Sequence, residues 1–243
     1  MALTLFLLGC ILVLAHTAET ILGFGCTLIA LALGVYLLPL ETLVPMLVIL
    51  GLLQSIWLVA RWYRHIDWRT LLLQILPLAV VGMVIGISSR GVADESTLKM
   101  VLGAFIIVIS LAELAMIFIK RAPAGQLRWY YRIPLLTGGG IFHGLFATGG
   151  PPIVYYASRQ FQKQEDFRAT LSTLWLFLNV GLIIGFILGG QMDLNKLGMA
   201  AMVLPGMILG IIIGSLIRVK ELWFKILTYI LLFFAGLFLL VQL

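Results

Sequence analysis

Charged residues are scarce in this sequence. Only 11% of the 243 residues are Asp, Glu, Lys or Arg, while 62% are apolar and the mean hydropathy is +1.14. A water-soluble domain carries roughly 25% charged residues and fewer than about half apolar ones. The deficit excludes a soluble globular fold and predicts that lipid surrounds most of the chain.

Cysteine and enzyme motifs are nearly absent as well. Cys10 and Cys26 are the two cysteines, both lie in apolar sequence, and neither belongs to a CxxC or Cys/His pattern. The sequence therefore predicts no disulfide, no metal site and no cofactor. Because H-E-x-x-H, G-x-S-x-G and paired aspartates are also missing, we expect no enzyme.

No polar stretch is long enough for a soluble domain. A membrane-spanning helix needs about 20 apolar residues, and stretches of this kind follow one another along the chain. They lie near 3–38, 42–60, 70–89, 97–119, 133–158, 169–190, 196–217 and 222–242. We therefore expect an all-α polytopic membrane protein with eight hydrophobic segments. No basic residues precede the first segment and further spans follow it, so we do not expect a cleaved signal peptide.

The longest polar stretch, residues 120–132, lies at the midpoint of the chain. We therefore predict an N-terminal repeat at 1–120, a linker at 121–132 and a C-terminal repeat at 133–243, all within one integral membrane domain.

The two halves share a spacing of proline and glycine. A P-x4-G-x3-G pattern returns after 128 residues, with Pro77, Gly82 and Gly86 in the first half and Pro205, Gly210 and Gly214 in the second. Asp67 and Asp193 precede the two copies, and Gly25 corresponds to Gly150. The pattern predicts an internal duplication, which is typical of secondary transporters whose site lies between the repeats.

The first segment of each half is interrupted. Residues 3–38 contain the polar run 16–20 and the Gly-Phe-Gly at 23–25, and residues 133–158 contain Thr-Gly-Gly-Pro-Pro at 148–152. Glycine permits non-helical backbone and proline lacks an amide donor. In lipid such backbone survives only where protein or a water-filled cavity satisfies it. We expect a broken helix that lines a site, the alternative being a kinked helix packed closely through glycine.

The distribution of Lys and Arg distinguishes two topologies. If all eight segments cross the membrane, eight basic residues fall on each side, whereas re-entrant first and fifth segments change the division to thirteen and three. The positive-inside rule favours the re-entrant arrangement. That arrangement leaves three spans in each half, so the halves would be inverted relative to each other.

Backbone amides at helix starts can bind an anion without a trapping countercharge. The breaks supply such amides, and proline suits the first turn of a following helix. The candidate substrate-binding residues at the breaks are Thr148, Gly149, Gly150 and Pro151 in the second half and Gly23 and Gly25 in the first.

Four further polar residues are candidates for the substrate path. Asn179 lies eleven residues beyond Arg168, about 16 Å along a helix and so near the bilayer midplane. Its amide either donates to an oxyanion or bonds a neighbouring helix, and Gln54 is its counterpart 125 residues earlier. Arg168 and Thr170 begin the sixth segment, where Arg168 either attracts anions or only anchors the helix at the headgroups.

Ionisable residues deep in apolar sequence tend to be functional because charge is costly there. His143 and Glu19 are the candidates for proton coupling, and His143 titrates nearest to neutral pH, at about 6.5 when unperturbed. A neutral histidine bonded to backbone is the alternative.

Two stretches of the second half carry a family resemblance. G-L-F-A-T-G-G-P-P-I-V-Y-Y at 144–156 and E-D-F-R-A-T-L-S-T-L-W-L-F-L-N at 165–179 resemble the TauE/SafE-type sulfite exporters, also described as 4-toluene sulfonate uptake permeases. Length, segment count and glycine-rich first segments extend the resemblance over most of the chain, although residues 22–25 are poorer in glycine than the family's usual run. The resemblance implies a multi-pass protein of the bacterial inner membrane that moves, usually outward, a small sulfur-containing anion such as sulfite, thiosulfate or an organosulfonate.

The expected partners are therefore a small anionic substrate and membrane lipid. The net charge of +6 does not indicate nucleic acid, because basic residues beside apolar spans hold loops at the anionic leaflet. Glycine-rich helix faces leave open a homo-oligomer. An anion channel and a non-transporting membrane scaffold are the alternative functions.

The re-entrant topology predicts that both termini lie outside the cytoplasm. We expect a reporter fused after Leu243 to report the external compartment, as measured by paired fusions that are active on only one side of the membrane. A cytoplasmic signal from the Leu243 fusion would exclude this topology.

Overall fold

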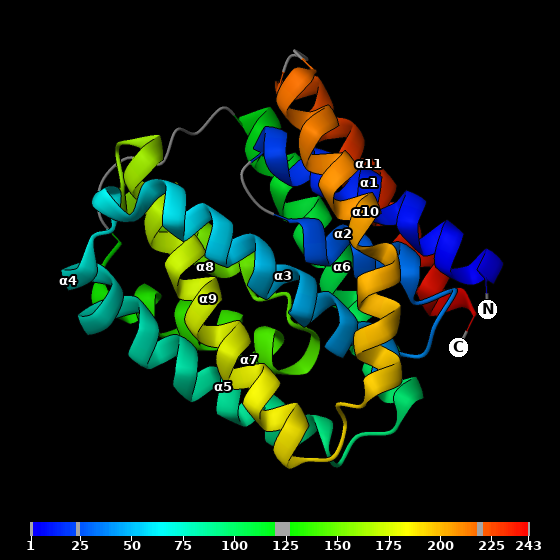
Figure 1. The fold of residues 1–243 in the computed structure, drawn as a ribbon. Helices are drawn as coiled ribbons and strands as arrows, with labels where there is room; N and C mark the ends of the chain where they lie inside the picture. The colour runs from blue at the N-terminus through cyan, green and yellow to red at the C-terminus, as the bar shows by residue number, and fades with distance from the viewer. Residues whose placement is uncertain (1, 23–24, 120–126, 218–220, 243) are drawn as a thin grey trace. The chain divides into compact units, whose positions relative to one another are not determined.

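The computed structural model describes residues 2–22, 25–119, 127–217 and 221–242. Gly23 and residues 120–126, which include half of the predicted linker at 121–132, lie outside these ranges. Every regular element in the described part of the chain is a helix. In chain order the elements are α1 (Ala2–Leu22), α2 (Cys26–Gly34), α3 (Leu40–Trp62), η1 (Tyr63–His65), α4 (Trp68–Thr70), η2 (Leu71–Ile75), α5 (Leu76–Arg90), α6 (Glu95–Ile119), α7 (Trp129–Phe146), α8 (Gly150–Gln160), α9 (Gln164–Leu188), α10 (Leu194–Leu216) and α11 (Glu221–Val241) (Figure 1).

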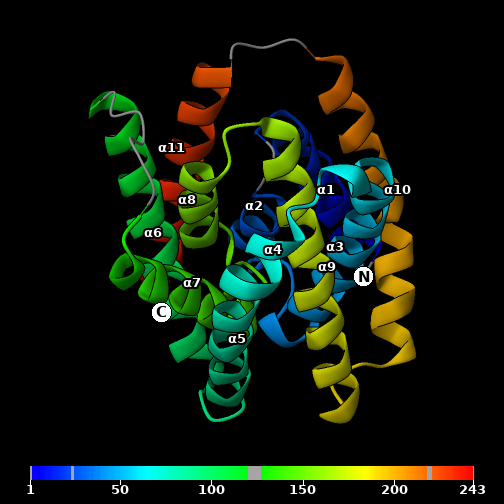
Figure 2. The same cartoon turned by 90° about the vertical axis from the view of Figure 1, so that its left-hand side faces the viewer.

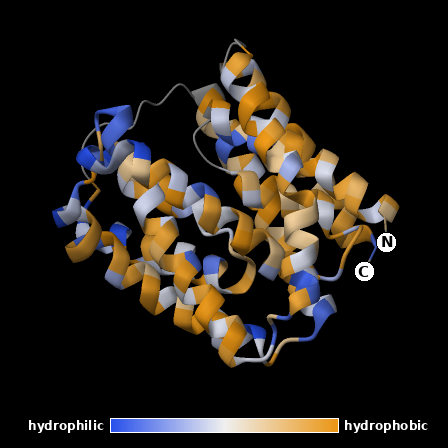
Figure 3. Cartoon of the chain, in the orientation of Figure 1, coloured by the Kyte–Doolittle hydropathy of each residue, from blue (hydrophilic) through white to orange (hydrophobic). Residues whose placement is uncertain are grey.

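The helices have the length and composition of membrane spans. Seven in the described ranges are long and apolar enough to cross a bilayer, one fewer than the eight segments predicted. The difference lies at residues 133–158, where α7 has 18 residues and α8 has 11, so neither supplies a long apolar window. Apolar residues cover most of the helical surface, and hydrophilic ones gather at helix ends and turns (Figure 3). The chain is a multi-pass membrane protein.

The chain forms two compact units that do not follow the sequence halves. Unit 1 comprises Met1–Leu43, Ala93–Ala122 and Gly198–Leu243, and unit 2 comprises Val44–Val92 and Pro123–Leu197. Each unit therefore takes segments from both predicted repeats. The division at 1–120 and 133–243 concerns sequence duplication, and it stays a prediction.

Unit 2 is built around the contact of α5 with α7, which lie side by side (Figure 1). An ideal Cβ on Gly82 would lie 2.0 Å from the carbonyl oxygen of Thr137, and one on Gly86 would lie 2.2 Å from that of Ile141. On α7, an ideal Cβ on Gly140 would lie 2.1 Å from the carbonyl oxygen of Ala79 on α5. Only a residue without a side chain lets the two backbones approach so closely, which is how helices associate in lipid.

Unit 1 repeats this contact between α10 and α1. A Cβ on Gly206 would lie 2.5 Å from the carbonyl oxygen of Gly9, and one on Gly210 would lie 2.6 Å from that of Val13. The hydroxyl of Thr17 donates to the Gly210 carbonyl over 3.1 Å. Both copies of the P-x4-G-x3-G pattern thus serve to seat a helix on the broken segment of its unit.

Helices α6 and α11 form the second close pair of unit 1 (Figure 2). Gly103 and Gly236 face each other, the Cβ of Gly236 falling 3.0 Å from the Gly103 carbonyl. The Lys225 ammonium lies 2.9 Å from the buried Glu113 carboxylate. This ion pair neutralises a charge that would be costly in lipid.

Aspartates mark the starts of three helices. Asp67 accepts hydrogen bonds from the amide and hydroxyl of Thr70, and Asp193 accepts one from the Lys196 amide over 2.7 Å. Asp94 does the same for Thr97 at the start of α6, and these bonds hold the pKa of the Asp94 carboxyl below its usual value. Such caps satisfy amide donors that have no helical partner.

Neighbouring glycines of α7 give a matched test of close helix contact. We expect Gly140→Ala to lower the free energy of unfolding of the detergent-purified protein by about 1–3 kcal/mol, and so to lower its melting temperature, because the new methyl group meets the Ala79 backbone. Gly138 has no atom within 4 Å of an added Cβ, so Gly138→Ala should leave the melting temperature unchanged or raise it slightly. Equal melting temperatures for the two variants would contradict this account of α5 and α7.

Candidate functional site

The predicted break in the second half is present. Helix α7 ends at Phe146, and Ala147 adopts the left-handed conformation with φ 55° while its amide bonds the His143 carbonyl. Helix α8 begins at Gly150, with Gly149 at its N-cap and two prolines in its first turn. The chain thus reverses at buried Thr148 and starts a new helix within the apolar sequence.

Gly149 and Gly150 differ in what surrounds them. An added Cβ on Gly149 would lie 2.1 Å from the Gly139 carbonyl oxygen and 2.9 Å from the Cβ of His143, so this position is filled by α7. Gly150 has no atom within 4 Å in the corresponding direction. The amides of both residues precede the first helical hydrogen bond of α8. Gly149 therefore lets the start of α8 pack against α7, and Gly150 leaves space beside the backbone amides of Gly149 and Gly150.

His143 is the buried polar group at this break. The residue is 2% exposed, and neither ring nitrogen reaches hydrogen-bond geometry with any described residue, although the Asn179 side chain interacts with the ring. Leaving a buried polar group unsatisfied costs about 1–3 kcal/mol. The ring nevertheless keeps its place, because it stacks on Trp175 with centroids 5.5 Å apart and planes 21° from parallel.

Asn179 lies beside this imidazole, on α9. Its side chain interacts with His143, and its Nδ2 atom would lie 3.2 Å from a Cβ placed on Gly51 of α3. Gln54 follows Gly51 by three residues, is buried, and so lies on the same face of α3. The structure thus brings three predicted residues, His143, Asn179 and Gly149, into one neighbourhood of unit 2.

Trp175 was not among the predicted residues, although a signal for it exists. It precedes Asn179 by four residues, which places both side chains on one face of α9. Gly139 was also missed, because its role depends on the contact with Gly149 that only the structure reveals.

Arg168 and Thr170 lie near the start of α9. The Thr170 side chain is fully buried, and its hydroxyl accepts a hydrogen bond from the Asp67 amide over 3.0 Å. Asp67 in turn caps α4, so Thr170 joins α9 to the beginning of the third segment. Arg168 is half-buried and precedes Thr170 by two residues on α9.

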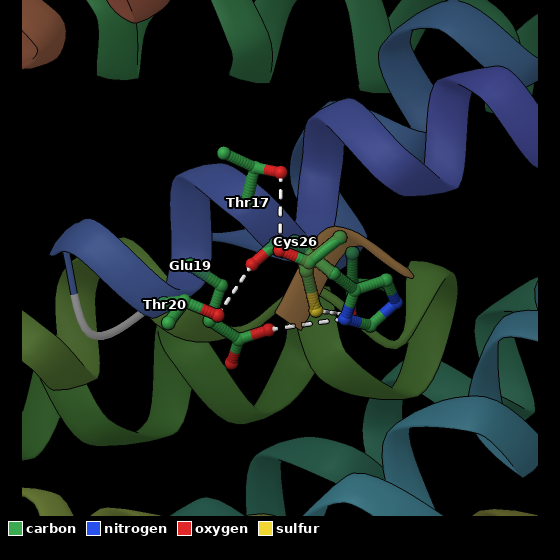
Figure 4. Close-up of polar contacts among 7 residues, drawn as sticks. Thr17, Glu19, Thr20 and Cys26 are labelled. Carbon is green, nitrogen blue, oxygen red and sulfur yellow. Dashed lines mark hydrogen bonds and ion pairs between the residues drawn. The ribbon is translucent and has the colours of Figure 1, made fainter. Parts of the chain in front are cut away.

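The break of the first half belongs to unit 1. Gly25 caps α2 with φ 101°, a conformation that favours glycine, and has no atom near an added Cβ. Glu19 lies near the end of α1, where one carboxylate oxygen is 3.8 Å from Nδ1 of buried His16 (Figure 4). Gly23, predicted as a binding residue, lies outside the described residues.

The neighbourhood in unit 2 offers neutral donors rather than charges. An imidazole N–H, the Asn179 amide, the Thr148 hydroxyl and two backbone amides can each donate to an oxygen atom. Donors of this kind hold an anion by hydrogen bonds and by the positive end of a helix, without a fixed opposite charge.

The family model for the sulfite exporter TauE/SafE matches residues 7–239. The chain belongs to this family. A curated relative from Cupriavidus necator, named probable sulfite/organosulfonate exporter TauE, is 26% identical over 203 residues, which cover 81% of this chain and 77% of the relative. No solved structure matches the chain significantly. The resemblance of residues 144–156 and 165–179 is thereby confirmed as membership of the TauE/SafE family.

The hydrogen bond between Thr170 and the Asp67 amide predicts that the Thr170 side chain stabilises the fold. We expect Thr170→Val to lower the unfolding free energy by about 1–3 kcal/mol, because the Asp67 amide loses its acceptor. Thr173→Val is the control, since the buried Thr173 hydroxyl only donates to the Ala169 carbonyl of its own helix. Thermal unfolding in detergent measures both, and an unchanged midpoint for Thr170→Val would contradict a structural role.

Proposed function

We propose that the protein is a secondary transporter, working as an exporter, of a small sulfur-containing anion such as sulfite, thiosulfate or an organosulfonate. It works by alternating access between the two halves of the chain in the bacterial inner membrane. The family membership supports the substrate class, and the relative from Cupriavidus necator carries a matching name. The proposal involves no enzymatic step and no cofactor.

One observation carries the proposal for the site. The imidazole of His143 is buried at a helix break, where Asn179 is the polar side chain that interacts with it and neither ring nitrogen reaches hydrogen-bond geometry with any described residue. The side chain of Asn179 interacts with this imidazole and supplies an amide donor. At the start of α8, no atom lies within 4 Å of a Cβ added to Gly150, which leaves space next to its backbone. A bound oxyanion would accept a hydrogen bond from the His143 imidazole, which otherwise bears part of the cost of burial. Thr148, Gly149, Pro151 and Gln54 complete the proposed binding region.

The helix boundaries support an internal duplication. Helices α1, α2 and α3 are related to α7, α8 and α9 by 124 residues: α1 ends at residue 22 and α7 at 146, α2 begins at 26 and α8 at 150, and α3 begins at 40 and α9 at 164. The residues that the glycines contact follow the same offset, because Gly210 meets Val13 and Gly82 meets Thr137, while the two glycines themselves are 128 residues apart. In this register Gly25 corresponds to Gly149, one residue away from the sequence-based pairing with Gly150.

The same register places Glu19 opposite His143. Each is an ionisable residue close before the break of its half, where a charge is costly. We propose these two residues as the proton-coupling groups, one in each half. The backbone amides of Gly23 and Gly25 would bind the anion in the first half, as we propose for those of Gly149 and Gly150 in the second.

Arg168 and Thr170 are proposed for the approach to the site. Arg168 lies eleven residues before Asn179, about 16 Å along α9, and can attract anions from the headgroup region. Thr170 would hold this end of α9 against Asp67.

An anion channel is the second candidate, because it can share a broken helix and neutral donors. Counterflow separates the two: a carrier loaded with unlabelled substrate accelerates uptake of labelled substrate, and a channel does not. A scaffold without transport activity would give neither result.

Flux in proteoliposomes tests the function and the site together. We expect saturable uptake of one anion among sulfite, thiosulfate, sulfate and a small sulfonate. Asn179→Ala should raise KM by about tenfold, the loss of one hydrogen bond to a charged group. Asn195, the other asparagine of the chain, is exposed at the start of α10, so Asn195→Ala is the matched control.

Failure of any sulfur anion to show saturable flux would contradict the substrate class. Equal KM values for Asn179→Ala and Asn195→Ala, with transport intact, would instead remove Asn179 from the site and leave the function standing.

A further inference from the structure

The break of the first half carries a cluster that anion binding does not use. His16 and Glu19 lie one turn apart on α1, and Cys26 is the first residue of α2. One ring nitrogen of His16, a carboxylate oxygen of Glu19 and Sγ of Cys26 all lie within 4.8 Å of one another. Figure 4 shows the Glu19 and Cys26 side chains close together, with a dashed line for the contact of His16 with Glu19.

We propose that these three side chains form a binding site for a thiophilic divalent cation of the Zn²⁺ class. The proposed ligand differs from the transported anion, and the proposal gives Glu19, the proposed proton-coupling group of the first half, a second role. The inference also departs from the expectation of no metal site, which rested on the absence of a Cys/His pattern in the sequence. The cluster escaped that pattern because a helix break, and not a short loop of fixed spacing, brings Cys26 to the other two.

The donor set determines the class of ion. Imidazole, carboxylate and thiolate are the three ligand types that zinc uses, whereas Mg²⁺ and Ca²⁺ prefer oxygen alone. One divalent ion with one carboxylate and one thiolate has no net charge, which suits a site inside apolar sequence. On binding, the Cys26 thiol forms a bond to the metal through sulfur and its proton passes to water.

The geometry requires only a small adjustment. A tetrahedral zinc ion would set its nitrogen, oxygen and sulfur ligands roughly 3.3–3.6 Å apart. His16 Nδ1 and Glu19 Oε2 are 3.8 Å apart, and rotation about side-chain bonds can bring the third atom closer. Three protein ligands leave the fourth position to water.

The backbone around the cluster is held in place. Thr20 donates its hydroxyl to the His16 carbonyl over 2.7 Å, and Thr17 bonds Gly210 of α10 (Figure 4). Gly210 lets α10 approach the Cβ of His16 to 3.0 Å. Gly25 supplies the left-handed turn that starts α2 at Cys26. A preformed site of this kind loses little entropy when it binds an ion.

Cys10 provides a matched control. It is exposed on α1, while Cys26 is buried in the cluster, and the chain has no third cysteine. After chelator treatment, full-length protein in detergent is titrated with Zn²⁺ against a zinc-binding dye, in parallel with Mg²⁺. We expect one tightly bound Zn²⁺ per chain, no competition by Mg²⁺, and unchanged affinity for Cys10→Ser. Cys26→Ser and Glu19→Gln should each weaken zinc binding at least about tenfold.

Cobalt provides a second readout that needs no ligand variant. Co²⁺ added to the Cys10→Ser protein should produce a thiolate-to-metal charge-transfer absorption, because Cys26 is then the only thiol. This experiment decides the question even if Cys26→Ser fails to fold. The absence of this absorption, or zinc binding by folded Cys26→Ser as tight as that of the Cys10→Ser protein, would overturn the proposal. Neither measurement depends on flux, so a failure of the transport proposal leaves the result unaffected.

Discussion

Close approach of helix backbones through glycine is the constraint on which this structure depends. Apolar side chains gain little by leaving lipid for protein, so helices in a membrane associate through short contacts between backbones. Gly82 and Gly86 on α5 and Gly206 and Gly210 on α10 make such contacts with α7 and α1. The same helices carry the breaks of the two halves. Glycine contacts thus hold one face of α1 and of α7, and each of these helices ends at a break.

The breaks then follow a rule specific to lipid. Every backbone polar group must find a partner inside the protein or in a water-filled space. At α7 and α8 the chain meets part of this demand by packing Gly149 onto Gly139, while Ala147 bonds back to His143. What remains at the break is the buried His143 imidazole, neither of whose ring nitrogens reaches hydrogen-bond geometry with any described residue. A binding site in such a protein therefore arises where helical geometry is interrupted.

Composition predicted the membrane class and the helical fold, the glycine and proline spacing predicted a break within 148–152, and the resemblance of residues 144–156 and 165–179 indicated the family. Those features depend on local physics: apolar length, glycine and proline placement, and motif letters. Eight hydrophobic segments were predicted, and seven helices in the described ranges are long and apolar enough to cross, because the predicted break divides the fifth segment into α7 and α8, neither of which supplies a long apolar window. The stacking of Trp175 on His143 depends on how α9 packs beside α7, and the meeting of Cys26 with His16 depends on how α2 turns back beside α1 at the break; periodicity encodes neither. Thr170 seemed from sequence alone a candidate for substrate contact, and its bond to Asp67 appears only when α9 and α4 are seen together.

Unit 1 combines the first and the last segments of the chain, and this arrangement has a consequence for the synthesis of the protein. Thr17 bonds Gly210, a residue 193 positions later in the chain, and both belong to the same unit. A ribosome that has just released α1 into the membrane has not yet made the helix that covers it. The first break, with His16 and Glu19, must therefore stay without its final neighbour during insertion of α3 to α9. Nascent chains at this stage have an incompletely covered polar segment, which makes them natural clients for insertion factors and membrane proteases until α10 arrives.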